Sequence, residues 1–244
     1  MPSLHVHDES DVIRWGRILA RGADARQYLQ GQLSCDLDSL KEGAYAQGLL
    51  LSPSGDVITS LTCVAQHDGI DVEVRYEDLD RTMSALRRFL LRTRCELSAD
   101  ISTDLCGGYE TYGEQVARGV PGPAEFERGL APHSFGRDYV SSHVSFTKGC
   151  FTGQELVGRL DARGANVPFR FARISGSDVA KMTEVVESVG PSGDRASQGL
   201  TTVVRGENVR ALGIVHRSLV GEERDVIIDG VRVEVLHDTG KSAR

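Results

Sequence analysis

Between residues 12 and 101 the chain alternates short strand-like runs with helical patterns, and this order limits the folds available to it. The run at 45–51 leads to the turn cluster Ser-Pro-Ser-Gly-Asp at 52–56, and a run rich in β-branched residues follows it, which predicts a hairpin. The run at 70–76 alternates apolar and charged side chains, as in a half-exposed strand. The predicted strands cover residues 12–20, 45–51, 57–65, 70–76 and 95–101.

Two helices are predicted among these strands. In residues 77–93 the apolar residues recur at spacings of four, three and four, which places them on one side of a helix. A shorter helix follows Asp24, a residue type that favours the N-cap position, and extends to about Leu33. Strands and helices in this order are typical of an α+β fold of the ferredoxin-like kind.

The second half of the chain shows a different pattern. Residues 107–145 are rich in Gly, Pro and Ser and are predicted to be mostly loop. From Phe169 onwards several short β-type runs follow one another, including one at 184–190, and Asp229-Gly230 is a strong hairpin signal. These runs predict a small C-terminal β-barrel or a β-sandwich, of which we expect the barrel. The expected division is therefore 1–165 for the ferredoxin-like units and 166–244 for the barrel.

Composition narrows the classes of protein to consider. The chain of 244 residues has a formal charge of −7, which disfavours general nucleic-acid binding because phosphate contacts need clustered positive charge. It contains no apolar run long enough to span a membrane and no N-terminal secretory pattern, so we expect a cytoplasmic protein. Its five cysteines are scattered without a C-x-x-C pair, which predicts neither a disulfide framework nor a metal site.

The stretch Lys-Gly-Cys-Phe-Thr-Gly-Gln-Glu at residues 148–155 has the most unusual composition in the chain. Thr152 and Glu155 have the spacing of a capping box, which predicts a helix that continues to about residue 163. Glu155 and Arg159 are four residues apart in the order that favours an ion pair. The predicted helix places Cys150 just before its N-terminus.

Two interpretations of Cys150 are open on these residues alone. Lys148 and a helix N-terminus both favour the thiolate form, and Gly149 and Gly153 allow the backbone to approach a ligand closely. Alternatively, the glycines form a turn and the thiol packs as a small apolar group. Residues 145–175 carry five basic and two acidic side chains, which would also suit an anionic small molecule or a solvated helix face.

The same stretch resembles the K-G-C-[FY]-x-G-Q-E motif of YgfZ-type folate-binding proteins, relatives of the glycine-cleavage aminomethyltransferase. Residues 22–37 are similar to the N-terminal motif of that family, residues 49–58 to its hairpin, and residues 118–121 to its G-[IV]-P element. This chain has Cys35 and Ala117 where the relatives usually have asparagine and glutamate.

The resemblance implies ferredoxin-like units and a barrel arranged as a ring around a central opening that holds tetrahydrofolate or a related reduced folate. It implies that Asp36 lies close to the folate and that Cys150, which faces the opening, is the functional thiol. The ligand-binding residues expected from the two motifs are Asp36, Lys148, Gly149, Thr152, Gly153, Gln154, Glu155 and Arg159.

Three functions follow from the resemblance and stay open at this point. The first is an accessory protein that supports assembly or repair of iron–sulfur clusters through Cys150, together with iron–sulfur proteins or assembly factors as partners. The second is a folate-dependent aminomethyl or one-carbon transferase. The third is a binding scaffold without chemistry. A cluster held by this chain alone would need four neighbouring thiolates, so we expect a partner to share it.

Overall fold

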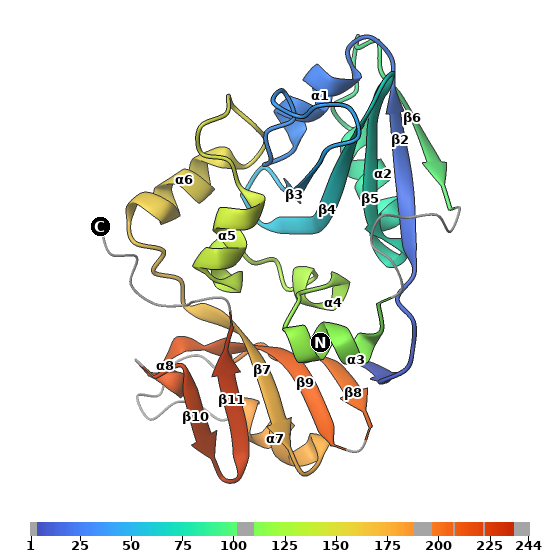
Figure 1. The fold of residues 1–244 in the computed structure, drawn as a ribbon. Helices are drawn as coiled ribbons and strands as arrows, with labels where there is room; N and C mark the ends of the chain where they lie inside the picture. The colour runs from blue at the N-terminus through green and yellow to red at the C-terminus, as the bar shows by residue number, and fades with distance from the viewer. Residues whose placement is uncertain (1–3, 102–109, 188–196, 207, 222, 237–244) are drawn as a thin grey trace.

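The computed structural model describes residues 4–101, 110–187, 197–206, 208–221 and 223–236. Two β-sheets form the two ends of the molecule, and short helices lie between them (Figure 1). The fold is thus mixed α+β, as predicted. None of the helices within the described ranges is long and apolar enough to cross a membrane.

The first sheet has five antiparallel strands in the order β3-β4-β5-β2-β6. Helices α1 and α2 pack against it and share a core that includes Ile18, Leu29, Val72 and Leu86. This arrangement confirms the strands and the two helices predicted before residue 101. The elements are β2 (Trp15–Arg21), α1 (Ala25–Gln32), β3 (Tyr45–Leu51), β4 (Val57–Gln66), β5 (Gly69–Arg75), η1 (Tyr76–Asp78), α2 (Leu79–Arg87) and β6 (Glu96–Asp100).

Strand β5 is buried on both faces, so the prediction of a half-exposed strand is wrong. Asp71, Glu73 and Arg75 are only 4%, 2% and 5% exposed. Their side chains alternate with the apolar ones and therefore leave the sheet on the face opposite α1 and α2. Arg17 on the neighbouring strand lies 3.8 Å from Asp71 and 3.4 Å from Glu73. The charged residues of this alternation pair with Arg17, Arg21 and Glu110 instead of facing water.

The second sheet has six strands in the order β1-β8-β9-β7-β11-β10, and β1 from the N-terminus pairs in parallel with β8. Among the described residues it is an open sheet with β1 and β10 at its edges, whereas the sequence predicts a small barrel or sandwich. Its elements are β1 (His5–Asp8), β7 (Phe169–Gly176), α7 (Val179–Glu187), β8 (Gly199–Arg205), β9 (Val209–His216), α8 (Arg217–Val220), β10 (Asp225–Ile228) and β11 (Val231–Val235).

Helix α7 corrects the prediction of a strand at 184–190. Residues 184–187 belong to this helix, and residues 188–190 lie outside the described part of the chain. Met182, Val185 and Val186 are spaced three and four apart and all three are buried against the sheet, which is a helical pattern. The hairpin predicted at Asp229-Gly230 is confirmed, since both residues have positive φ (49° and 81°) between β10 and β11.

The sequence predicts mostly loop for residues 107–145; residues 107–109 lie outside the described part of the chain, but most of the remaining residues form short helices of a middle layer between the sheets. Its first helix has a capping box between Thr111 and Glu114 and ends at Gly119 in the left-handed conformation (φ 66°). The T-x-x-E spacing at 111–114 is the signal in the sequence that indicates this helix. The layer contains α3 (Tyr112–Arg118), α4 (Pro123–Phe126), η2 (Pro132–Phe135), α5 (Arg137–His143) and α6 (Gln154–Ala162).

An aromatic cluster in this layer joins the two sheets. Phe135 is fully buried, and its ring centroid lies 5.5 Å from that of Phe126, 5.4 Å from that of Tyr139 and 5.6 Å from that of Phe171. The same core includes Leu49 of the first sheet. Because Phe171 belongs to the second sheet, Phe135 contacts the core of both halves.

We expect Phe135→Ala to lower the free energy of unfolding by about 3 to 5 kcal/mol, because it opens a cavity between the sheets. Phe89→Ala is the matched control, since Phe89 is 44% exposed, and should change stability by about 0.5 kcal/mol or less. Urea unfolding followed by circular dichroism measures both. Equal effects of the two substitutions would show that Phe135 does not join the sheets.

Candidate functional site

A pocket of about 510 Å³ lies between the open face of the first sheet and helices α3 and α5. We call it the central pocket. Strands β2, β3, β4 and β5 supply one wall, and residues of the middle layer supply the other. Its lining residues are Trp15, Gln47, Ser60, Leu61, Thr62, Arg75, Glu110, Arg118, Val120, Pro121, Asp138, Tyr139, Ser142 and His143.

A carboxylate between two guanidinium groups dominates the charge of the central pocket. Glu110 lies 3.5 Å from the buried Arg75 and 3.1 Å from Arg118 at the surface. Burial lowers the pKa of Arg75, and Glu110 opposes this effect. Arg75 also lies 4.8 Å above the Trp15 ring, a cation–π distance. The fixed positions of these groups give the pocket a defined pattern of charge.

The pocket also presents aromatic rings and a hydrogen-bond donor. The Trp15 Nε1 atom is buried and has no hydrogen-bond partner among the described residues. Tyr139 stacks on His143 with a centroid distance of 4.2 Å, and burial raises the pKa of the Tyr139 phenol. A buried donor without a partner costs roughly 1 to 3 kcal/mol, so the indole N–H favours a ligand that brings an acceptor.

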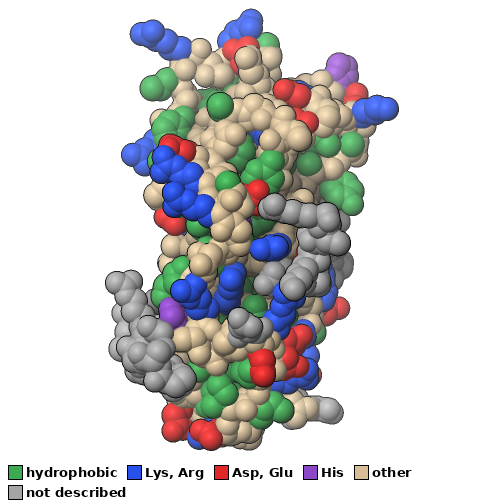
Figure 2. Space-filling model, turned by 90° about the vertical axis from the view of Figure 1, so that its left-hand side faces the viewer, with side chains coloured by type: hydrophobic (Ala, Val, Ile, Leu, Met, Phe, Trp, Pro, Cys, Tyr) green, Lys and Arg blue, Asp and Glu red, His purple; other side chains and the backbone are tan. Residues whose placement is uncertain are grey.

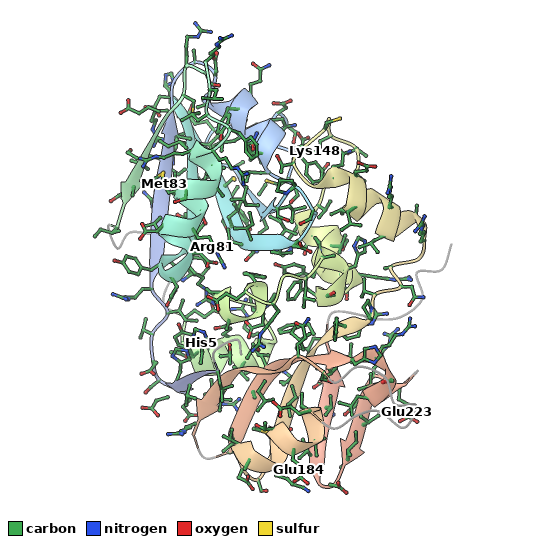
Figure 3. All side chains as sticks on the ribbon, turned by 180° about the vertical axis from the view of Figure 1, so that it is seen from behind. His5, Arg81, Met83, Lys148, Glu184 and Glu223 are labelled. Atoms are coloured by element: carbon green, nitrogen blue, oxygen red, sulfur yellow. The ribbon has the colours of Figure 1, made fainter. Side chains whose placement is uncertain are left out.

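The motif at residues 148–155 lies outside the central pocket, and Lys148 fixes it to the first sheet. The Lys148 ammonium donates to the carbonyls of Gln30, Leu33 and Cys35 at 2.6, 2.7 and 2.7 Å. These carbonyls lie at or just after the C-terminal end of α1, where helical carbonyls lack partners. Burial lowers the pKa of Lys148, although Cys35 and Asp36 oppose this effect. Figure 3 labels Lys148 beside α1.

Two further residues of the motif also have structural contacts. Gly153 has φ 81°, and a Cβ there would meet the Ser52 carbonyl oxygen at 2.7 Å, so the 52–56 turn fits only against glycine. The Thr152 amide donates to the Gly31 carbonyl at 3.1 Å, and its hydroxyl donates to the Gln32 side chain at 3.3 Å. The motif is thus attached to both α1 and the β3–β4 turn.

These contacts explain why the predicted capping box of Thr152 and Glu155 is wrong. Helix α6 begins at Gln154 with Gly153 as its N-cap, and no side chain caps it. Thr152 uses its polar groups on α1, while Glu155 pairs with Arg159 at 2.5 Å, which confirms the predicted i,i+4 pair. The Gln154 side chain accepts from the Phe151 amide at 3.3 Å.

Cys150 is exposed, which argues against the interpretation that its thiol packs as a small apolar group. It follows the exposed Gly149 and precedes Phe151, whose ring is buried in the core that joins the sheets. Cys150 is not among the residues that line the central pocket, so the structure does not show the expected orientation of its thiol toward a central opening. Since Lys148 and Phe151 are both held in place, the Cys150 thiol sits on a fixed loop at the surface.

Asp36 lies near Lys148 and not in the central pocket. Its carboxylate accepts from the Gln30 side chain at 2.8 Å and from the Asp38 amide at 3.2 Å. The hydrogen bond from Gln30 is the main reason that the pKa of Asp36 is lowered. In this structure Asp36 shapes the loop after α1.

Cys35, which departs from the asparagine of the resembling family, is buried beside Cys63. A hydrogen bond from the Cys63 thiol lowers the pKa of Cys35, and the same pairing raises the pKa of Cys63. A Cβ on Gly48 would lie 2.5 Å from the Cys35 sulfur, so strand β3 packs closely against this thiol at Gly48. The pair is therefore part of the packing of the first sheet.

The basic residues of 145–175 do not form one site. Lys148 contacts α1, Arg159 pairs with Glu155, and Arg173 pairs with Glu234 at 2.6 Å. Arg170 lines a separate surface hollow with Arg217 and Arg224. Figure 2 shows Lys and Arg side chains across the middle of one face of the molecule.

Sequence reasoning missed the central pocket. The signal for it is the charged set of the alternating strand 70–76, of which Arg75 is one member, together with the capping box at Thr111 that places Arg118 on α3. Both patterns are visible in the sequence, but neither indicates that the two elements face one another. Of the ligand-binding residues expected from the motifs, none lines the central pocket.

The chain was compared with protein families, with known sequences and with solved structures. No family model matches the chain. It is 28% identical over 93 residues to the tRNA-modifying protein YgfZ of Sodalis glossinidius, a match that spans 38% of this chain and only 28% of that protein. It is 22% identical over 222 residues to the YgfZ protein of Hamiltonella defensa, covering 62% of this chain and 65% of that protein. An uncharacterized protein of Haemophilus influenzae is 24% identical over 246 residues, covering 85% and 88%.

Among solved structures, the glycine cleavage system aminomethyltransferase T from Bartonella henselae superposes with a TM-score of 0.66 at 11% identity. The match covers 93% of this chain and 84% of that one. The chain therefore has an aminomethyltransferase-like fold. With the sequence relatives, this is a fold of the YgfZ type, which confirms the resemblance that the 148–155 motif indicates.

We expect Lys148→Met to lower the free energy of unfolding by about 2 to 3 kcal/mol, because three carbonyls lose a charged donor. Cys150→Ala, two residues away, should change it by about 0.5 kcal/mol or less, since the thiol is exposed. Chemical unfolding of both variants measures the difference. A large loss of stability in Cys150→Ala would favour the packing interpretation of this thiol.

We also expect Cys150 to be alkylated by iodoacetamide in the native protein much faster than Cys35 and Cys63, because both of those are buried. Peptide mass spectrometry at increasing times gives the three rates, and the unfolded protein is the control in which they converge. Comparable native rates for Cys35 would contradict its burial beneath Gly48.

Proposed function

We propose that the chain binds a reduced folate of the tetrahydrofolate type in the central pocket. We further propose that it is an accessory protein which supports assembly or repair of iron–sulfur clusters, with Cys150 as the functional thiol. The observation that carries the folate proposal is the Arg75–Glu110–Arg118 arrangement beside the Trp15 ring.

The chemistry of the pocket fits a reduced pterin. A pterin edge carries N–H donors next to a carbonyl acceptor, so it needs a carboxylate and a donor side by side. Glu110 supplies the carboxylate and Trp15 Nε1 supplies an unpartnered donor. Arg118, which reaches the surface, suits the carboxylates at the other end of a folate. The volume of about 510 Å³ lies within the range of small-molecule sites.

Ala117 stands where the resembling family usually has glutamate, but this difference does not remove Glu110, Trp15 or Arg118 from the central pocket. Ala117 lines a different hollow, with Arg173 and Arg210, so its small side chain takes no carboxylate from the central pocket. Glu110 and Asp138 remain there. The proposal therefore assigns the carboxylate role to Glu110.

The position of Cys150 favours an accessory role over one-carbon transfer. In the transferase alternative Asp36 would orient the bound folate, but neither Asp36 nor Cys150 lines the central pocket, and Cys150 is exposed. A thiol in this position is suited to meet a partner protein. In the described part of the chain no three His, Cys, Asp or Glu side chains are grouped to hold a metal ion, so a partner would supply the other ligands of a cluster.

The YgfZ relatives are named for tRNA modification. Given the formal charge of −7, we propose that this chain supports such a process through a partner enzyme and does not bind tRNA itself. Iron–sulfur proteins or their assembly factors are the partners that an exposed thiol of this kind would serve.

Calorimetric titration with tetrahydrofolate tests the ligand and its location together. We expect saturable binding that Glu110→Gln weakens by about 10-fold to 100-fold, since a buried charged hydrogen bond is lost. Asp36→Asn and Cys150→Ala are the controls and should bind as the unaltered protein does. Loss of binding in Asp36→Asn alone would place the folate at the loop of Asp36 and Lys148. No binding to the unaltered protein would remove the folate proposal.

A further inference from the structure

A second pocket, of about 340 Å³, lies on another side of the molecule at the junction of its two halves. We call it the junction pocket. Figure 3 labels Arg81 and His5, which approach it from the upper and lower halves. Its lining residues are His5, His7, Glu77, Asp78, Asp80, Arg81, Tyr112, Gln115, Pro123, Ala124, Glu125, Glu127 and Thr202. The proposed folate site and the thiol loop share none of them.

The rim of the junction pocket is negatively charged. Among its lining residues, five are carboxylates and Arg81 is the sole guanidinium. Asp78 already uses both oxygens, one toward Arg81 and one toward the Thr59 hydroxyl at 2.7 Å. Glu77, Asp80 and Glu127 are exposed at the rim. The pocket therefore attracts cations.

The floor of the pocket contains an acceptor without a donor. Gln115 is 1% exposed, and its amide nitrogen donates to the Val120 carbonyl at 3.0 Å. That contact orients the amide, and its Oε1 atom has no hydrogen-bond partner among the residues that the structure describes. Leaving a buried acceptor unsatisfied is unfavourable, so this oxygen favours a ligand that brings a donor.

Glu125 lies beside this floor and adds a second acceptor group. It is fully buried and accepts from the Thr202 hydroxyl and the Gly122 amide, both at 2.7 Å. Burial raises the pKa of Glu125, although the hydrogen bonds from Thr202 and the Gly122 amide oppose this effect. A bound cation would stabilise the ionised carboxylate.

One wall of the pocket is aromatic and uncharged near neutral pH. His7 stacks on Tyr112 with a centroid distance of 3.5 Å, and burial lowers the pKa of His7 below its ordinary value. The Tyr112 hydroxyl donates to Glu77 at 3.1 Å, which holds that carboxylate at the rim. His7 therefore adds no positive charge that would repel a cation.

We propose that the junction pocket is a binding site for a primary ammonium group on an aliphatic chain. An ammonium carries three donors and no acceptor, which matches a floor of acceptors and a rim of carboxylates. Pro123 and Ala124 supply apolar surface for the methylene groups. Both a free aliphatic amine and a lysine side chain of another protein carry this chemistry. The proposal is independent of the folate site.

Titration of the whole protein with 1,5-diaminopentane, followed by calorimetry, tests this site. We expect saturable binding, while the uncharged 1,5-pentanediol of the same length should not bind. A parallel titration with Nα-acetyl-lysine methylamide separates the two sources. Binding at least as tight as that of the diamine indicates a lysine side chain, and binding of the diamine alone indicates a free amine.

Two variants locate the binding, and one serves as the control. Glu77→Gln should weaken the amine about threefold to tenfold, since it removes a rim charge but keeps the shape of the side chain. Gln115→Met, which removes the unpartnered acceptor, should weaken it about tenfold or more. Glu96→Gln, an exposed change on β6 away from this pocket, should have no effect. The proposal is overturned if neither amine binds, if the diol binds equally well, or if Glu77→Gln and Gln115→Met leave the affinity unchanged.

Discussion

The apolar core between the two sheets is the constraint on which the rest of this structure depends. Phe135 lies at its centre, with Phe171 of the second sheet and Leu49 of the first sheet in the same core. Because this core holds the sheets at a fixed separation, polar residues from both halves meet at its edges. Tyr139 illustrates the link, since it packs in the core and also lines the central pocket. Phe151 links the same core to the loop that carries Cys150.

The packing of the middle of the molecule buries charged side chains, which is unfavourable unless each is paired with an opposite charge. Arg17 lies between Asp71 and Glu73, and Arg75 lies beside Glu110. Isolated charges would be strongly unfavourable in this layer, whereas paired ones are tolerated. Of these pairs, Arg75 with Glu110 lines the central pocket and contributes to its chemistry. The surface that would face water in an isolated sheet becomes the wall of a binding site once the middle layer covers it.

The 148–155 motif contains residues that hold the loop in place and one cysteine, Cys150, that is exposed. Lys148 completes the end of α1, Gly153 fits the turn of the hairpin, and Thr152 bonds to α1. An unusual local composition therefore need not mean that each residue touches a ligand. Three of the positions that look functional in the sequence stabilise the place where the fourth, Cys150, is presented.

Local patterns allowed much of the fold to be predicted. The alternation at 70–76, the Leu79–Met83–Leu86 stripe and the Asp229-Gly230 turn each depend on neighbours in the sequence, and each forms the predicted element, although the strand at 70–76 is buried on both faces. The helix α7 was missed because Val185 and Val186 favour strands when they are considered singly, and only their packing against the sheet shows the helical period.

The site was less predictable, for a physical reason. The sequence by itself determined most elements of the first sheet, the hairpin at Asp229-Gly230 and the YgfZ-type resemblance, since these follow from short-range spacing and composition. Only the tertiary structure decided that Arg75 and Glu110 share a pocket. It also decided that the Lys148 ammonium bonds to carbonyls at the end of α1, and that Gln115 and Glu77 line the same pocket. Contacts between residues far apart in the chain depend on how the layers pack, and that packing is set by the shared core as a whole and not by any one segment.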